Sequence, residues 1–282
     1  MFELAQAAAF DGQPLGRPVL GTEASIGAAD PARLEAWRAQ LYAPNQLVVS
    51  AAGAIDEDEL LSLAERLFGG AKPAPSMQGA PAIFTGGRAG ETKRLEQAHL
   101  VLFLPGVGAV DPDYFAARVF TEALGGGMSS RLFQEARERL GLAYAIDAFA
   151  ESYQDAGLIG VYAGCAAKDA VGLAKVVAGE FRKLAAGVGA AELARAKAQL
   201  KAALFMARES LSARAEQAAA QLLVFGRLLS TQEIADAIDA VSAADLGRLA
   251  ERIVAPQRSA PAVLGPSRAL AAADAFHDAM FG

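Results

Sequence analysis

The chain has 282 residues, of which 53% are hydrophobic and 21% charged, a composition typical of globular proteins with a substantial core. Its net charge of −6 argues against nucleic-acid binding, and no apolar run reaches the ~20 residues that would span a bilayer. The opening residues include Glu3 and lack the basic segment of a signal peptide, so we expect a cytoplasmic protein.

The first 70 residues predict a few short elements. Residues 1–29 are interrupted by glycine and proline and are predicted mostly as loop after a short helix. An Asp-Pro pair opens residues 30–41 with the types favoured at a helix N-cap and first position. The apolar run 47–55 predicts a buried strand, and residues 56–70 predict an amphipathic helix that a Gly-Gly pair ends.

Residues 71–90 contain four glycines and three prolines with little periodicity, which predicts a linker and a domain boundary. The patterns beyond it predict strands over 99–104, 143–151, 157–164 and 262–265, and helices over 112–124, 131–139, 167–186 and 190–225, followed by two short helices from residues 231 and 243. These elements suffice for a complete α+β domain. The helix, strand and helix before the linker are too few to close a sheet, so we expect the first domain to need further residues upstream.

Several stretches of the chain together resemble one known family. The first is QPLGRPVLGTEASI, followed by LYAPNQLVVSAAGAIDEDELLSLAERLF. The second is GGGMSSRLFQEARERLGLAYAIDAFAESYQDAGLIGVYAG, followed by ARESLSARAEQAAAQLLVFGR and IDAVSAADLGRLAERI. In order and spacing these are similar to the zinc metallopeptidases of the M16 family, which includes insulinase and the mitochondrial processing peptidase.

The resemblance implies a LuxS/M16-type metalloenzyme fold, in which an antiparallel sheet packs with helices and two related domains enclose an extended peptide. Residues 1–70 would be the C-terminal part of the first domain, 71–90 the linker, 91–268 the complete second domain, and 269–282 a C-terminal tail. The family's zinc is held in the first domain by a His-x-x-Glu-His helix and a distant glutamate. Neither element is present here.

The histidine count leads to the same expectation without the resemblance. A catalytic zinc normally takes three protein ligands, often two histidines one helical turn apart. This chain has only His99, at the head of an apolar strand, and His277, near the C-terminus. We interpret them as a strand-edge histidine and a solvated tail histidine. No cofactor is therefore expected in this chain, and zinc is expected only in the missing first-domain half or in a partner.

Arg137 and Tyr144 are the candidate site residues, because they lie four and eleven residues after Phe133 in the matching stretch. The resemblance implies that this pair reaches toward substrate, where guanidinium and phenol donors would bind peptide carbonyls or stabilise an oxyanion. From spacing alone, Arg137 could equally pair with Glu135 or Glu138 on the surface. Tyr144 could be an ordinary strand tyrosine.

Other motifs give plainer interpretations. Gly125-Gly126-Gly127 lacks the lysine and preceding strand of a phosphate loop, so we interpret it as a flexible turn between helices. The stretch RESLSARAEQ is predicted as a solvated helix face, and neither histidine has a nucleophile elbow nearby for Ser-His-Asp catalysis. Cys165, the one cysteine, excludes an intrachain disulfide framework and is predicted as a small buried residue.

Three hypotheses follow. In the first, the chain contributes the substrate-chamber half of a zinc metalloendopeptidase, is inactive alone, and works on an extended peptide with a zinc-bearing M16 partner or as a homodimer. In the second, it is a non-catalytic scaffold that resembles core subunits of respiratory complexes. In the third, it is an unrelated ligand-binding α+β protein.

Overall fold

The computed structural model describes residues 1–70, 72–75 and 79–282, so positions 71 and 76–78 of the predicted linker lie outside the described residues. By its contacts the chain divides into two compact units. The larger unit comprises Met1–Val19, Pro81–Ala202 and Gln232–Gly282, and the smaller comprises Leu20–Ala80 and Ala203–Thr231. The boundary predicted at residues 71–90 separates the two domains expected from the family resemblance. The division by contacts is a different one, so this boundary stays a prediction.

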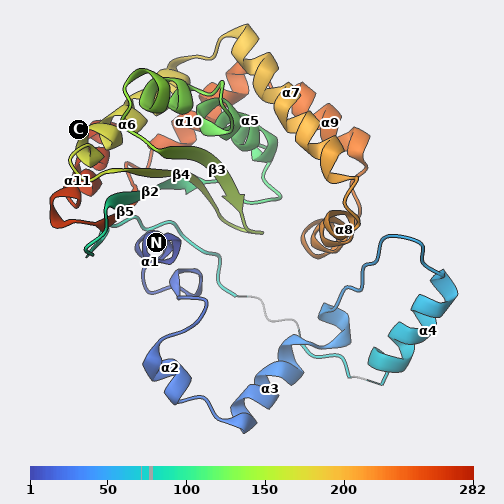
Figure 1. Ribbon diagram of the computed structural model, residues 1–282. Helices are drawn as coiled ribbons and strands as arrows, with labels where there is room; N and C mark the ends of the chain where they lie inside the picture. Colours follow the sequence, from blue (N-terminus) through green and yellow to red (C-terminus); the bar gives the residue numbers. More distant parts are fainter. Residues whose placement is uncertain (71, 76–78) are drawn as a thin grey trace. The chain divides into compact units, whose positions relative to one another are not determined.

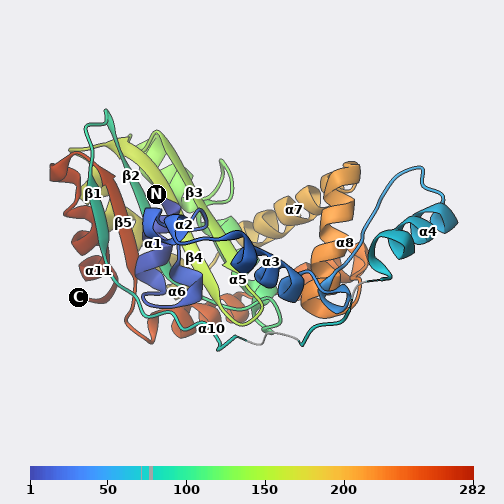
Figure 2. The same ribbon diagram turned by 90° about the horizontal axis from the view of Figure 1, so that it is seen from below.

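The larger unit is built on a five-stranded sheet in the order β1-β5-β2-β4-β3 (Figures 1 and 2). Its strands are β1 (Ala89–Thr92), β2 (Gln97–Gly106), β3 (Ala145–Ser152), β4 (Gly157–Ala166) and β5 (Ala260–Gly265). β1 runs parallel to β5, and the other neighbours are antiparallel. The α+β class and the strands predicted after the linker are confirmed, whereas β1 was not predicted because its short sequence has no apolar alternation.

One face of the sheet packs against helices. These are α5 (Tyr114–Gly125), α6 (Ala170–Ala186), α10 (Ala243–Val254) and α11 (Ala272–Phe281). Alternate residues of β2, such as Leu100 and Leu102, join the main core on this side, together with Phe120 of α5 and Phe181 of α6. The centroids of the two phenylalanine rings lie 5.0 Å apart. Cys165 is buried in the same core, as predicted, and burial raises the pKa of its thiol to about 11.

The opposite face is covered in part by the first helix, α1 (Phe2–Ala9). Val101 and Phe103 of β2 point to this side and form a second core with Ala5 and Ala9 of α1. Because β2 buries side chains on both faces, its sequence is a continuous apolar run. His99 therefore belongs to a central strand, and its interpretation as a strand-edge residue is wrong.

Two regions in the C-terminal half of the chain differ from the predictions. The helix predicted over 190–225 is interrupted: α7 (Ala190–Ala207) ends, and α8 (Leu211–Phe225) starts anew at Ser210, whose hydroxyl accepts a hydrogen bond from the Ala213 amide at 3.2 Å. A serine N-cap competes with helix continuation. Residues 269–282 are no loose tail, because α11 packs on α6 and buries Phe276 and Met280.

The smaller unit contains α2 (Glu23–Gly27), α3 (Pro31–Leu41), α4 (Glu57–Phe68) and α8. The predicted N-caps are confirmed, since Asp30 and Asp56 each accept a backbone hydrogen bond at 2.9 Å. The buried strand predicted over residues 47–55 is wrong for the described residues: the segment has no strand and is half-exposed or exposed. A strand needs a neighbouring strand for its backbone hydrogen bonds, and the smaller unit supplies none in its described part.

An ion-pair network fastens α10 to the segment before α5. The carboxylate of Asp113 is buried and binds the guanidinium groups of both Arg248 and Arg252. Arg252 also donates to Asp111, at 2.9 and 3.1 Å, and this hydrogen bond lowers the pKa of the Asp111 carboxyl. Within the described residues, no helix combines the length and the apolar run required to cross a bilayer.

We predict that Arg252→Met lowers the free energy of unfolding by about 2 kcal/mol at pH 7, because buried Asp113 loses one of its two cations. Asp111 has a lowered pKa in the folded state, so its contribution is present above the unfolded pKa and disappears as pH falls through the folded pKa. Urea unfolding should therefore show a smaller difference between variant and parent at pH 3 than at pH 7. Arg94→Met, at an exposed position, is the control; an equal loss in both variants would contradict the assignment.

Candidate functional site

The segment that carries Arg137 is a π-helix, Phe133–Arg139, where an α-helix was predicted. The wider turns appear at its end, where the Leu140 amide donates to the Glu135 carbonyl at 3.0 Å. Ala136 is fully buried and anchors this segment to the main core. Side-chain periodicity does not distinguish the wider helix from an α-helix over so short a stretch. π-Helical segments are rare and frequent at functional sites.

Arg137 is half-exposed, and its guanidinium carbon lies 4.6 Å from the centre of the Phe133 ring. Its Nε is 3.8 Å from a carboxylate oxygen of Glu138, a loose pair between exposed side chains that contributes little stability. The alternative partner, Glu135, is instead paired with Arg139. Arg137 is therefore held by an aromatic face, and among the described residues no hydrogen bond is found for its guanidinium.

Tyr144 lies just before β3, and a positive φ of 61° at Gly141 turns the chain toward it. Its amide donates to the Gly164 carbonyl of β4 at 2.8 Å, while 59% of the residue stays exposed. Among the described residues, no hydrogen-bond partner is found for its phenol. The π-helix packs against β3, so Arg137 and Tyr144 belong to one region of the larger unit, although no direct bond joins them in the described part.

Each histidine lies within hydrogen-bond distance of a different hydroxyl group of this chain. Nδ1 of His99 lies 3.0 Å from the Tyr162 hydroxyl, and Nδ1 of His277 lies 2.9 Å from the Ser259 hydroxyl. His277 sits within α11, so its interpretation as a solvated tail residue is wrong. Over the described ranges, no three side chains of His, Cys, Asp or Glu gather in a way that could hold a metal ion. The side chains in the described part of the chain therefore do not offer the three-ligand set that a catalytic zinc normally takes.

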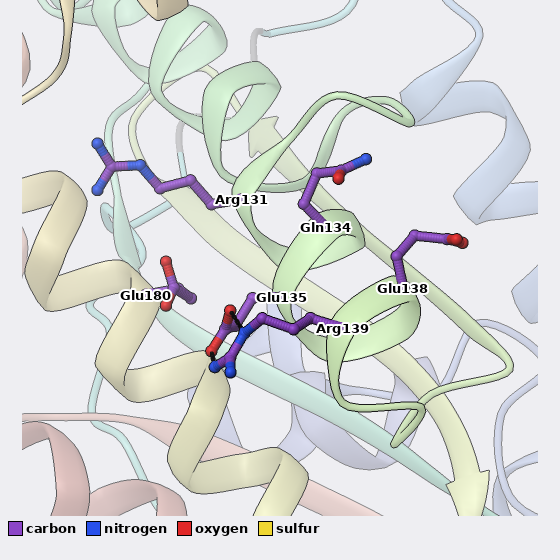
Figure 3. Close-up of a pocket in the computed structure, with 6 residues that line it drawn as sticks. All are labelled: Arg131, Gln134, Glu135, Glu138, Arg139 and Glu180. Carbon is purple, nitrogen blue, oxygen red and sulfur yellow. Dashed lines mark hydrogen bonds and ion pairs between the residues drawn. The ribbon is translucent and has the colours of Figure 1, made fainter.

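A polar pocket of about 490 Å³ lies beside the π-helix, and sequence reasoning missed it. Its lining consists of Arg131, Gln134, Glu135, Glu138, Arg139 and Glu180. Figure 3 shows Glu180 projecting from α6 on the side where Glu135 and Arg139 pair. Its charges are largely paired: Arg131 makes a bidentate bond to Glu192, at 2.6 and 2.8 Å, and Lys183 binds Glu180 at 2.6 Å. The charge-rich run from Arg131 to Arg139 was the available signal, but Glu180 is too distant in sequence to be linked to it.

Gly126 and Gly127 lie in the predicted turn after α5, where the Ser130 amide donates to the Gly127 carbonyl at 3.0 Å, whereas Gly125 belongs to the helix. Gly125 is the last residue of α5, and a Cβ built there would lie 2.6 Å from the Cβ and the amide nitrogen of Ala148. α5 therefore approaches β3 more closely than any larger residue permits.

The comparisons with known proteins show the family and the fold of this chain. A family model described as "Peptidase M16 inactive domain" matches residues 28–200, which include Arg137 and Tyr144. An uncharacterized zinc protease of Rickettsia bellii is 34% identical over 259 residues, covering 92% of this chain and 63% of its own length. One of Streptomyces coelicolor is 34% identical, covering 91% of this chain and 58% of its own length. The chain belongs to the peptidase M16 family, and it spans less than two thirds of these relatives.

A solved structure shares the fold. A chain of complex III2 from Candida albicans, with Inz-5 bound, superposes with a TM-score of 0.87, over 99% of this chain and 69% of that chain. Their sequences are 24% identical, so this likeness establishes the fold alone.

We predict that Gly125→Ala destabilises the larger unit by about 1–3 kcal/mol, because the new methyl group overlaps Ala148. Gly172→Ala in α6 is the matched control: its Cβ would meet no atom within 4 Å, so helix propensity should stabilise it by up to about 1 kcal/mol. Urea unfolding monitored by circular dichroism measures both. Equal midpoints for the two variants would contradict the close packing of α5 on β3.

Proposed function

We propose that this chain supplies the substrate-chamber half of an M16-type zinc metalloendopeptidase and does not hydrolyse peptides alone. The observation that carries the proposal is the contrast between its metal ligands and its hydrogen-bond donors. The two histidines are engaged with Tyr162 and Ser259, whereas Arg137 and Tyr144 are exposed.

The catalytic metal is assigned outside this chain. A zinc centre would supply the activated water that attacks the peptide carbonyl, and it requires about three protein ligands with an open position. The donor set of this chain does not meet that requirement in its described part. Zinc would then be held by first-domain residues outside this chain or by a zinc-bearing M16 partner chain.

Arg137 and Tyr144 would act on the substrate. A guanidinium that rests on Phe133 presents several N–H donors in a fixed plane, and the exposed phenol offers one O–H donor. Such donors orient an extended peptide through its carbonyls and stabilise the negative charge that develops on the attacked carbonyl oxygen. Relatives named as zinc proteases support a role in peptide hydrolysis.

A second candidate is a non-catalytic scaffold subunit. The observation that favours it is the likeness in fold, at a TM-score of 0.87, to a chain of a multi-protein complex. The two candidates differ in whether Arg137 and Tyr144 contribute to turnover.

Mixing the chain with a zinc-bearing M16 homologue should produce cleavage of an unstructured fluorogenic peptide. Arg137→Ala should then lower kcat about 10- to 100-fold and Tyr144→Phe about 10-fold, as expected for donors that contact the reacting carbonyl. Arg139→Ala and Tyr114→Phe are matched controls, because Arg139 is engaged with Glu135 and Tyr114 lies in α5.

Full turnover in both site variants would reduce Arg137 and Tyr144 to structural residues. A complex that forms with the homologue but remains inactive toward peptides would favour the scaffold.

A further inference from the structure

Side chains four residues apart are neighbours along the helical segment that carries Arg137. Leu132 and Ala136 are fully buried in the main core, so this pair fixes the inner side of the segment. Phe133 and Arg137 each follow one member of the buried pair. Phe133 is half-buried and Arg137 is exposed, which places the two side chains at the border between core and solvent. The Phe133 ring therefore belongs to a segment that core packing anchors.

Arg137 is held differently from the arginines on either side of it. Arg131 and Arg139 each donate two hydrogen bonds to a glutamate, and Figure 3 shows the pair that Arg139 makes. Arg137 instead has its guanidinium carbon over the Phe133 ring, 4.6 Å from the ring centre. A carboxylate oxygen of Glu138 is 3.8 Å from its Nε, which is beyond hydrogen-bond distance. The ring is therefore the closer support of this guanidinium.

A ring face and a carboxylate leave a guanidinium with different capacities to bind a ligand. A carboxylate accepts up to two N–H groups that lie in the guanidinium plane. A ring face attracts the cation through the negative potential above the ring, and arginine stacks on such faces with its edges open. The contact with Phe133 thus restrains Arg137 without occupying the N–H groups that a peptide carbonyl would need.

We propose that Phe133 is the positioning residue for Arg137: its ring orients the guanidinium and leaves the N–H groups available to a peptide carbonyl. A free arginine side chain samples many rotamers, and ordering it during the reaction costs conformational entropy. A guanidinium that is already oriented in the resting protein avoids part of that cost. This inference rests on the proposed function, because Phe133 acts through a donor of that same site.

The first test is a double-substitution cycle, in which the full chain is mixed with a zinc-bearing M16 homologue and cleaves an unstructured peptide. Phe133→Leu keeps an apolar side chain and removes the ring, so kcat should fall about 2- to 5-fold while KM changes less. In the Arg137→Ala background the same substitution should leave kcat unchanged. Phe133→Tyr keeps the ring face and should retain the parental kcat. Phe133→Glu should lower kcat at least as much as Phe133→Leu, because a carboxylate occupies the guanidinium donors.

The second test needs no activity and uses the full chain alone. In the NMR spectrum, the ring current of Phe133 should shift the Cδ proton resonances of Arg137 upfield, and Arg137→Lys identifies these resonances by their loss. Phe133→Leu should abolish the shift. Phe115→Leu is the matched control for both tests, because it removes another half-buried ring, in α5, that contacts Tyr114 and, among the described residues, no cation. It should keep both the shift and the parental kcat.

Two results would overturn the positioning role and leave the proposed function intact. One is an equal loss of kcat from Phe133→Leu in the parent and in the Arg137→Ala background, which is the behaviour of a merely structural residue. The other is a set of Arg137 resonances that Phe133→Leu does not move. Absence of cleavage by every mixture would overturn the proposed function, and the positioning role with it.

Discussion

Burial of β2 on both faces is the constraint on which the larger unit depends. The apolar run of this central strand can be shielded only if helices cover one side and another element covers the other, and α1 fills the second role. Because α1 extends over β5 and β2, the edge strand β3 keeps exposed side chains, Asp147 and Glu151, on that face. The same sheet therefore provides both a stable core and an exposed surface. It also places the segment from Arg137 to Tyr144 next to its edge strand, β3.

Much of this fold could be predicted from local patterns. Apolar runs and helical spacing identified β2 to β5 and most helices, and the Asp-initiated caps at residues 30 and 56 were correct. Predictions failed where distant contacts decide the outcome. β1 exists only through its pairing with β5, α11 is held by α6, and residues 47–55 have a strand-like sequence without a neighbouring strand in the described part.

The residue types of the candidate site could be predicted from the sequence, but the surroundings of each side chain could not. The family resemblance singled out Arg137 and Tyr144, yet only the structure shows a guanidinium resting on Phe133 in a π-helix and a phenol that is largely exposed. The aromatic contacts of Phe2 had no sequence signal, because Phe149 of β3 and Tyr162 of β4 meet this ring only through the packing of α1 on the sheet. Burial and pairing depend on neighbours that lie far away along the chain.

We propose that any peptide hydrolysis in which this M16 chain takes part depends on a metal held outside the chain. The most direct test of this proposal is the zinc content of the purified, dialysed full chain, measured by mass spectrometry alongside an assay of peptide cleavage by the chain alone. The account predicts zinc well below one ion per chain and no cleavage. One tightly bound zinc per chain accompanied by cleavage of an unstructured peptide would contradict it.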